Sequence, residues 1–93
     1  MGTCLMLFAI EFSKTASEQL EYWKIHNLRI KKKIDKLLLE ISTTPFSGTG
    51  KPENLKYILS GLWSRRITGK HRLVYFVVDK KVTIVSCEGH YDF

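Results

Sequence analysis

Residues 62–88 read LWSRRITGKHRLVYFVVDKKVTIVSCE, and the expected architecture follows from this stretch. It is rich in Val, Ile, Tyr, Phe and Trp, which are the residues that favour β-strands. Two short polar breaks, Gly69-Lys70 and Asp79-Lys80-Lys81, divide it into strands expected at 62–68, 71–78 and 82–88. Connections this short join antiparallel neighbours, so the three strands are expected to form a meander.

Helices are expected on the N-terminal side of this meander. The residues Thr15-Ala16-Ser17-Glu18 have the S/T-x-x-E form of a capping box, and Asn27 has the form of a second N-cap. Beyond Asn27 an apolar stripe recurs at helical spacing, at Ile30, Ile34, Leu37, Leu38 and Ile41. Residues 5–12 are apolar enough for a further strand. The sequence therefore predicts a single α+β domain over residues 1–93, with a helical hairpin covering one face of a sheet.

The composition restricts the classes of protein that fit. With 15 Lys+Arg against 9 Asp+Glu, the net charge is +6, which favours anionic partners such as nucleic acid. The apolar run at residues 5–10 is far shorter than the ~20 residues of a membrane span. The two cysteines are too few for a disulfide framework, so a cytoplasmic protein is expected. Cys87, near the end of an apolar strand, fits a buried inert thiol better than a nucleophile paired with His90.

Residues 42–52, STTPFSGTGKP, have the composition of a loop. The Gly-Thr-Gly-Lys within it is not a phosphate-binding P-loop. Pro45 stands where that motif needs its first Gly, and Pro52 follows the Lys in place of Ser or Thr. Nucleotide binding is therefore not expected.

A group of basic and aromatic residues gathers late in the chain, and one acid follows the loop. The group comprises Arg65, Arg66, His71, Arg72, His90 and Tyr91, and the acid is Glu53. Cleavage of RNA by its own 2′-hydroxyl needs a base for the 2′ proton, cations for the charged phosphate and an acid for the leaving 5′ oxygen. Glu53, Arg72 and His90 are the candidates for these roles. The histidines and cysteines are too scattered to bind a metal, so neither a metal nor another cofactor is expected.

The turn between two strands decides whether the cations can act together. Arg66 and Arg72 share a face of the sheet only if the turn between their strands holds an odd number of residues, as a turn of residues 69–71 would. Singly, each of these charged residues also fits an ordinary solvated surface. From the residues alone, catalytic cleavage of RNA and non-catalytic binding of nucleic acid both stay open.

Four segments together resemble the YoeB/Txe toxins of the RelE superfamily. Residues 44–56, TPFSGTGKPENLK, are similar to the TPFxGxGKPExLK loop of these toxins. Residues 59–68, LSGLWSRRIT, resemble their LSGxWSRRIT segment, and residues 71–75 match their HRLVY strand. Residues 87–91 match the terminal CxxHY, and the resemblance runs in register from about Ser13 to Tyr91.

The resemblance implies a toxin of a bacterial toxin–antitoxin pair with the fold of the microbial RNases, a twisted antiparallel sheet with an N-terminal helical hairpin on one face. Its implied activity is that of a metal-independent endoribonuclease, which cuts mRNA in the decoding A site of the ribosome by 2′-hydroxyl attack and so inhibits translation. The implied partners are an acidic, partly disordered antitoxin of the YefM/Phd type, the 70S ribosome with its mRNA, and a second copy in a homodimer, with no membrane. The alternative is a non-catalytic ribosome- or RNA-binding blocker of translation.

Matched position by position, the resemblance also implies roles for single residues. Glu53 would be the general base and His90 the general acid, while Arg72 would stabilise the transition-state phosphate with support from Arg66. Tyr91 would position the substrate or stack on it. The implied RNA-binding residues are Lys51, Lys56 and Arg65. The basic segment 29–36 is a candidate contact for ribosomal RNA, with a plain solvated helix face as the alternative.

Overall fold

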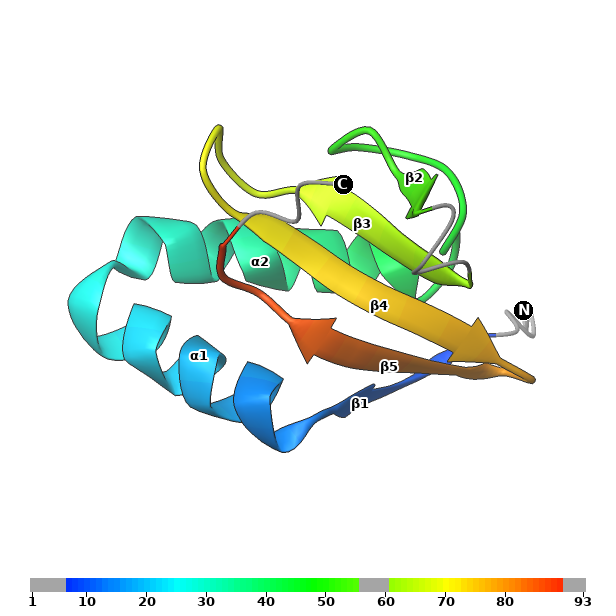
Figure 1. The fold of residues 1–93 in the computed structure, drawn as a ribbon, viewed down its shortest axis with the longest axis horizontal. Helices are drawn as coiled ribbons and strands as arrows, with labels where there is room; N and C mark the ends of the chain where they lie inside the picture. The colour runs from blue at the N-terminus through cyan, green and yellow to red at the C-terminus, as the bar shows by residue number, and fades with distance from the viewer. Residues whose placement is uncertain (1–6, 56–60, 90–93) are drawn as a thin grey trace, which may run out of the picture.

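The computed structural model describes residues 7–55 and 61–89 (Figure 1). The elements follow one another as β1 (Ala9–Phe12), α1 (Lys14–His26), α2 (Leu28–Ile41), β2 (Glu53–Leu55), β3 (Leu62–Arg66), β4 (Arg72–Val78) and β5 (Lys81–Ser86). They form a five-stranded sheet in the order β1-β5-β4-β3-β2, and α2 crosses behind β3 and β4 (Figure 1). The predicted α+β class and the helical hairpin are confirmed.

The sheet is mixed. The strands from β2 to β5 pair antiparallel with their neighbours, as the short connections predicted, whereas β1 pairs parallel with β5. The intervening chain, and not a tight turn, separates β1 from β5, so nothing forces this pair to be antiparallel. Of the strand expected at residues 5–12, the part at 9–12 is β1, and residues 5 and 6 lie outside the described residues.

The N-caps of the two helices show where local signals were sufficient. Asn27 caps α2 as predicted, because its Oδ1 accepts a hydrogen bond from the Ile30 N–H at 3.3 Å. The cap of α1 is Ser13 and not Thr15, so that prediction was wrong by two positions. The Ser13 Oγ accepts from the Ala16 N–H at 3.0 Å and donates to the Val85 carbonyl at 2.8 Å. The contact with the Val85 carbonyl, near the end of β5, favours Ser13 as the cap. Val85 is far along the chain, so the sequence around the helix start could not predict this contact.

The strand β2 is the element that the sequence pattern did not reveal. It has three residues and pairs antiparallel with β3, with Glu53 opposite Ser64. The pairing with β3 stabilises a segment too short to show a period of its own. Residues 42–52, by contrast, contain no helix or strand, as expected of a loop.

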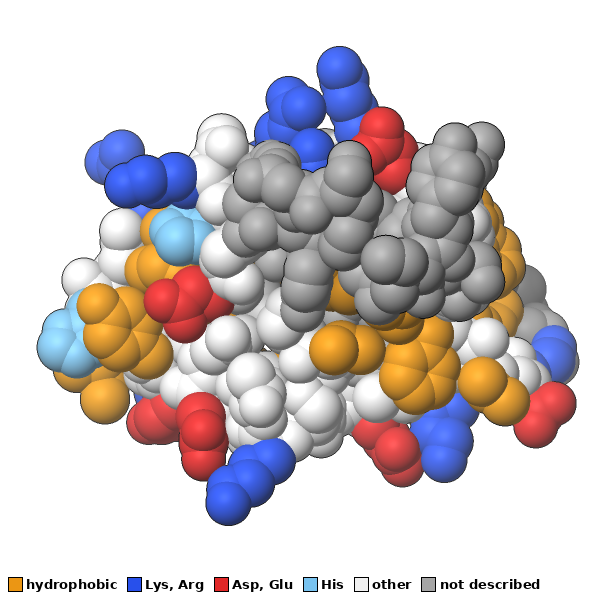
Figure 2. All heavy atoms as spheres, viewed as in Figure 1, with side chains coloured by type: hydrophobic (Ala, Val, Ile, Leu, Met, Phe, Trp, Pro, Cys, Tyr) orange, Lys and Arg blue, Asp and Glu red, His pale blue; other side chains and the backbone are white. Residues whose placement is uncertain are grey.

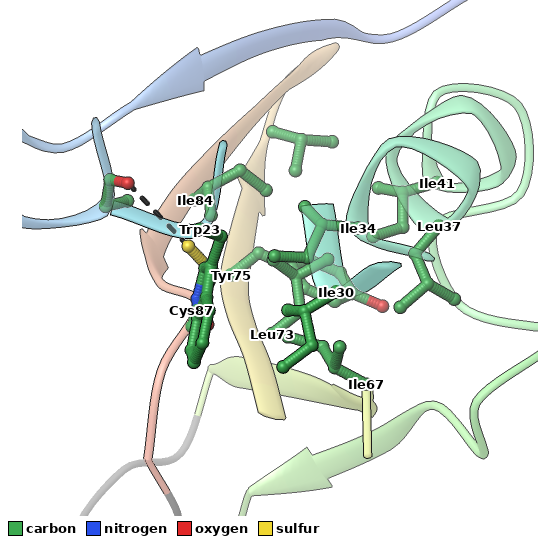
Figure 3. Close-up of a cluster of buried hydrophobic side chains, with 12 residues drawn as sticks. Trp23, Ile30, Ile34, Leu37, Ile41, Ile67, Leu73, Tyr75, Ile84 and Cys87 are labelled. Atoms are coloured by element: carbon green, nitrogen blue, oxygen red, sulfur yellow. Dashed lines mark hydrogen bonds between the residues drawn. The ribbon is translucent and has the colours of Figure 1, made fainter. Parts of the chain in front are cut away.

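The core lies between the two helices and the sheet face that they cover (Figure 3). The buried side chains of α2 pack toward those of β4 and β5, and Trp23 contributes from α1. The members include Trp23, Ile30, Ile34, Leu37, Ile41, Leu73, Tyr75, Ile84 and Cys87. Cys87 is fully buried, and this burial raises the pKa of its thiol to about 12. The expectation of a buried thiol is confirmed, and the thiolate that a nucleophile needs is strongly disfavoured.

Neither helix among the described residues has the length and apolarity needed to cross a bilayer.

Candidate functional site

The register of the sheet brings three of the predicted site residues to one face. Arg66 lies directly opposite Arg72 between β3 and β4, and Glu53 lies directly opposite Ser64 between β2 and β3. Residues opposite each other in an antiparallel pair project from the same face, as do residues two apart in one strand. Glu53, Ser64, Arg66 and Arg72 therefore share the face that the helices do not cover.

The predicted condition for the two arginines is met. The N–H groups of Ile67 and Thr68 both donate to the His71 carbonyl, at 2.9 and 3.1 Å. With Ile67 and His71 joined in this way, residues 68–70 form the turn. Their number is odd, as required, although the turn lies one position earlier than the expected 69–71.

Arg72 is the best-held cation of this face. Its Nη1 donates to the Ser64 Oγ at 3.2 Å and lies 3.5 Å from the Glu53 Oε1. The Arg72 side chain is 16% exposed, whereas the Glu53 side chain is 62% exposed. Ser64 is fully buried, so its hydroxyl is a fixed acceptor at the base of the site. The arrangement offers an exposed carboxylate as a proton acceptor beside a held guanidinium and the exposed Arg66, which suits a phosphate and a hydroxyl next to it.

The loop before β2 is fastened directly to β3. The Gly50 carbonyl accepts from the Arg66 N–H at 2.7 Å, and a Cβ on Gly50 would lie 3.0 Å from the Arg66 carbonyl oxygen. Gly50 also has a φ of +84°, and the exposed Lys51 follows with a φ of +51°. A positive φ at a lysine is uncommon, and such backbone is concentrated at functional sites. Lys51 therefore stands two residues from Glu53 on a backbone that the sheet holds in place.

Arg65 does not belong to this face. Its side chain is fully buried on the helix side of the sheet, so a direct contact with RNA, implied by the resemblance, is not available to it. The Nε donates to the Tyr75 hydroxyl at 3.1 Å, Nη1 donates to the Glu40 Oε1 at 2.7 Å, and Nη2 donates to the Ser47 carbonyl at 2.7 Å. We correct the assignment: Arg65 holds the loop that leads to Lys51.

Further hydrogen bonds complete the buried network around Arg65. Nη1 and Nη2 also donate to the Thr49 and Thr44 carbonyls, at 3.2 and 2.5 Å, and the Tyr75 hydroxyl donates to the Pro45 carbonyl at 2.6 Å. The Glu40 carboxylate accepts from the Thr49 N–H and hydroxyl, and these bonds together with Arg65 lower its pKa. Burial raises the pKa of Tyr75, so its hydroxyl stays protonated and can donate.

Three predicted site residues have no described position. His90, Tyr91 and Lys56 lie outside the described residues, and so their roles stay predictions. The sequence reasoning missed Ser64 as the anchor of Arg72, and it gave His71 no role of its own. His71 is partly buried, and its Nδ1 accepts a hydrogen bond from the Gly89 N–H at 2.9 Å. Strand alternation could have found Ser64, because it lies two residues before Arg66.

Positive charge also covers the exposed side of α2. Ile30, Ile34, Leu37 and Ile41 are buried, which leaves the exposed Arg29, Lys32, Lys33 and Lys36 on the opposite face. A pocket between α2 and the loop is lined by Lys33, Lys36, Leu37, Glu40 and Thr49, and none of the predicted catalytic residues lines it. Figure 2 shows the side of the sheet away from α2, where Lys and Arg side chains lie along both the upper and the lower edge of the molecule. Within residues 7–55 and 61–89, no group of three or more His, Cys, Asp or Glu side chains could hold a metal ion.

Comparison with known proteins gives a consistent result. Residues 12–91 match the model of the YoeB-like toxin of bacterial type II toxin–antitoxin systems. Toxin YoeB of Escherichia coli K12 is 49% identical over 80 residues, which are 86% of this chain and 95% of that protein. The YoeB dimer from Staphylococcus aureus is 44% identical with a TM-score of 0.83, over 90% of this chain and 98% of that chain. A heterotetrameric YoeB–YefM toxin–antitoxin complex from the same organism has a TM-score of 0.81 at 44% identity, with the same coverage of both chains.

Proposed function

Because the chain belongs to the YoeB-like toxin family of bacterial type II toxin–antitoxin systems, we propose that it is a ribosome-dependent mRNA endonuclease. It cuts mRNA in the decoding A site, leaves a 2′,3′-cyclic phosphate and a 5′-hydroxyl, and so inhibits translation. The observation that supports this most is the common face of Glu53, Arg66 and Arg72. A carboxylate beside two guanidinium groups has the composition that metal-free cleavage of RNA needs.

In this mechanism Glu53 is the general base that takes the proton of the 2′-hydroxyl. Its high exposure and its distance of 3.5 Å from Arg72 leave the carboxylate free to turn toward a bound nucleotide. Arg72 faces the charge that develops on the phosphate as the 2′ oxygen attacks, with Arg66 beside it. Because the Ser64 Oγ holds the Arg72 Nη1, the guanidinium needs little rearrangement when the charge appears.

The other roles follow from the matched positions of the family motifs. His90 is the general acid that protonates the leaving 5′ oxygen, and Tyr91 positions the nucleotide or stacks on it. Lys51 and Lys56 contact the RNA backbone. The base, the acid and the cations are all supplied by side chains, so the reaction uses no metal and no other cofactor.

The proposed partners are the ribosome with its mRNA and an antitoxin. The exposed cations of α2, Arg29, Lys32, Lys33 and Lys36, form a second positive surface that fits ribosomal RNA. A net charge of +6 suits an acidic antitoxin segment that folds as it binds, of the YefM kind seen with the S. aureus toxin. By analogy with the S. aureus dimer, a second copy of the chain completes the proposed assembly. A ribosomal target places this activity in the cytoplasm.

Primer extension on an mRNA translated in vitro tests the proposed activity. Discrete breaks within codons that appear only when the protein and ribosomes are both present are the expected result. Stalled ribosomes on intact mRNA would instead favour a non-catalytic blocker, which the basic surface of α2 alone could support. Toxin added with a stoichiometric excess of its antitoxin is the matched control and should leave the mRNA uncut.

A further inference from the structure

Side chains from α1 hold the backbone of the segment that follows β5. The Cys87 N–H donates to the Gln19 Oε1 at 2.7 Å, and the Trp23 Nε1 donates to the Cys87 carbonyl at 3.0 Å. Both backbone polar groups of Cys87 are therefore bound by one helix. A residue outside the sheet ladder thus has both of its backbone polar groups paired.

Gly89, two residues later, is bound through both of its backbone polar groups by His71 and Arg72, at the start of β4. Its N–H donates to the His71 Nδ1 at 2.9 Å, and its carbonyl accepts from the Arg72 N–H at 2.9 Å. Gly89 has a φ of +85°, a conformation that glycine adopts without strain. In the sequence Gly89 directly precedes His90. The residue that leads into the proposed general acid is thus tied to the backbone of Arg72, the proposed phosphate-binding cation.

The His71 ring is itself held in place. Its centroid lies 4.8 Å from that of Trp23 in an edge-on contact at 68°, and the Trp23 indole is the group that binds Cys87. The His71 N–H donates to the Thr68 Oγ1 at 3.1 Å, which fixes the backbone from which the ring projects. The imidazole therefore presents its Nδ1 lone pair to Gly89 from a fixed position.

We propose that His71 is a positioning residue for the endonuclease: its Nδ1 holds the Gly89 N–H, and the Gly89 carbonyl in turn holds the backbone N–H of Arg72, the proposed phosphate-binding cation. This inference rests on the proposed function. His71 contacts neither phosphate nor leaving group, and it acts only through Gly89. A displacement of about 1 Å between a catalytic cation and the phosphate it faces is enough to cost a large factor in rate.

Three variants distinguish the effect of the His71 hydrogen-bond acceptor from that of its aromatic ring. His71→Phe keeps a ring against Trp23 and removes the acceptor for the Gly89 N–H. His71→Asn places its Oδ1 where the Nδ1 stands and keeps the acceptor without the imidazole. His26→Phe is the matched control. The His26 ring also packs on an aromatic ring of α1, that of Tyr22, with the two centroids 4.4 Å apart. Thermal unfolding of each variant establishes that it is folded.

Two measurements are made on each folded variant. Hydrogen exchange of the Gly89 amide, read by NMR, should be faster by about tenfold in His71→Phe than in the parent. The single-turnover rate of mRNA cleavage at saturating ribosomes should fall by at least about tenfold, with little change in the ribosome concentration at half-saturation. His71→Asn should restore most of both values, and His26→Phe should match the parent in both.

Three results would overturn the inference: unchanged Gly89 exchange in His71→Phe, faster exchange with an unchanged saturated rate, or a folded His71→Asn that restores neither value. A parent protein that cuts no mRNA would instead overturn the proposed function. The exchange measurement would then still decide whether His71 holds Gly89, so the two failures are distinguishable.

Discussion

Arg65 and Arg66 are consecutive residues of β3, and their side chains leave opposite faces of the sheet. The Arg65 guanidinium is fully buried against Tyr75 and Glu40, whereas Arg66 is exposed and lies opposite Arg72. The first arginine holds the loop from the inside, and the second stands on the outer face where Glu53 begins β2. One dipeptide thus contributes both to the buried support of the candidate site and to its exposed face.

Replacing Arg65 should destabilise the protein far more than replacing Arg66. Arg65→Met removes the hydrogen bonds to Glu40, Tyr75 and the loop carbonyls, and it leaves the Glu40 carboxylate without its cation. We expect the free energy of unfolding to fall by about 3 kcal/mol. Arg66→Met, the control, should change it by no more than about 0.5 kcal/mol. Urea denaturation of both variants measures this difference, and equal losses would contradict the buried role of Arg65.

The lowered pKa of Glu40 predicts a specific loss of stability in acid. Hydrogen bonds from Thr49 and the charge of Arg65 hold this pKa below the usual value of 4.5. The contribution of Glu40 is therefore fully present above pH 4.5 and is lost as the pH falls through the pKa of the folded state. The stability difference between the parent and Glu40→Gln should be constant near neutrality and shrink below pH 4.5. A difference that stays constant down to pH 3 would show that Glu40 titrates normally.

Local pattern was sufficient for much of the fold. The apolar stripe of α2 and the alternating β-rich segments predicted their elements to within a few residues, because each element buries one face of its own. The sheet pairing of β2 and the Ser13 cap of α1 depend on groups far along the chain, and neither could be seen locally.

The candidate site also has a part that the sequence predicted and a part that it did not. Glu53, Arg66 and Arg72 were predicted from motif and spacing, and strand register brings them to one face. The resemblance implied an RNA contact for Arg65, although alternation along β3 places it on the side of Leu73 and Tyr75. Its partner Glu40 lies 25 residues away on α2, and only the tertiary structure joins them.

The proposed nucleophile predicts how the substrate can be made resistant. Attack by the 2′-hydroxyl requires that group on the nucleotide before the cut, and only RNA carries it. An mRNA with a single 2′-O-methyl nucleotide at the cleavage position should remain intact, while the same mRNA methylated several codons away should be cut normally. Primer extension compares the two substrates. Cutting through the modified position at the normal rate would require water as the nucleophile and would exclude this mechanism.

Metal independence is tested without dismantling the ribosome. Chelators remove the Mg²⁺ that ribosomes need, so Mg²⁺ is instead replaced by cobalt hexammine, which offers no open coordination position. Cleavage on intact, programmed ribosomes should continue, because in the proposed mechanism Glu53, Arg72 and His90 supply the base, the cation and the acid. Sedimentation of the ribosomes controls for their integrity. Loss of cleavage on ribosomes that remain assembled would indicate that a bound metal ion takes part.

The most direct test of the account is the single-turnover rate of mRNA cleavage by Arg72→Ala on saturating programmed ribosomes. In the proposed mechanism Arg72 faces the charge that develops on the phosphate, so its loss should lower this rate by about 10²–10³-fold. Lys32→Ala on the exposed face of α2 is the comparison variant. It should weaken ribosome affinity, most clearly at low salt, and leave the saturated rate intact. An Arg72→Ala protein that cuts at the rate of the parent would contradict the catalytic assignment of this face.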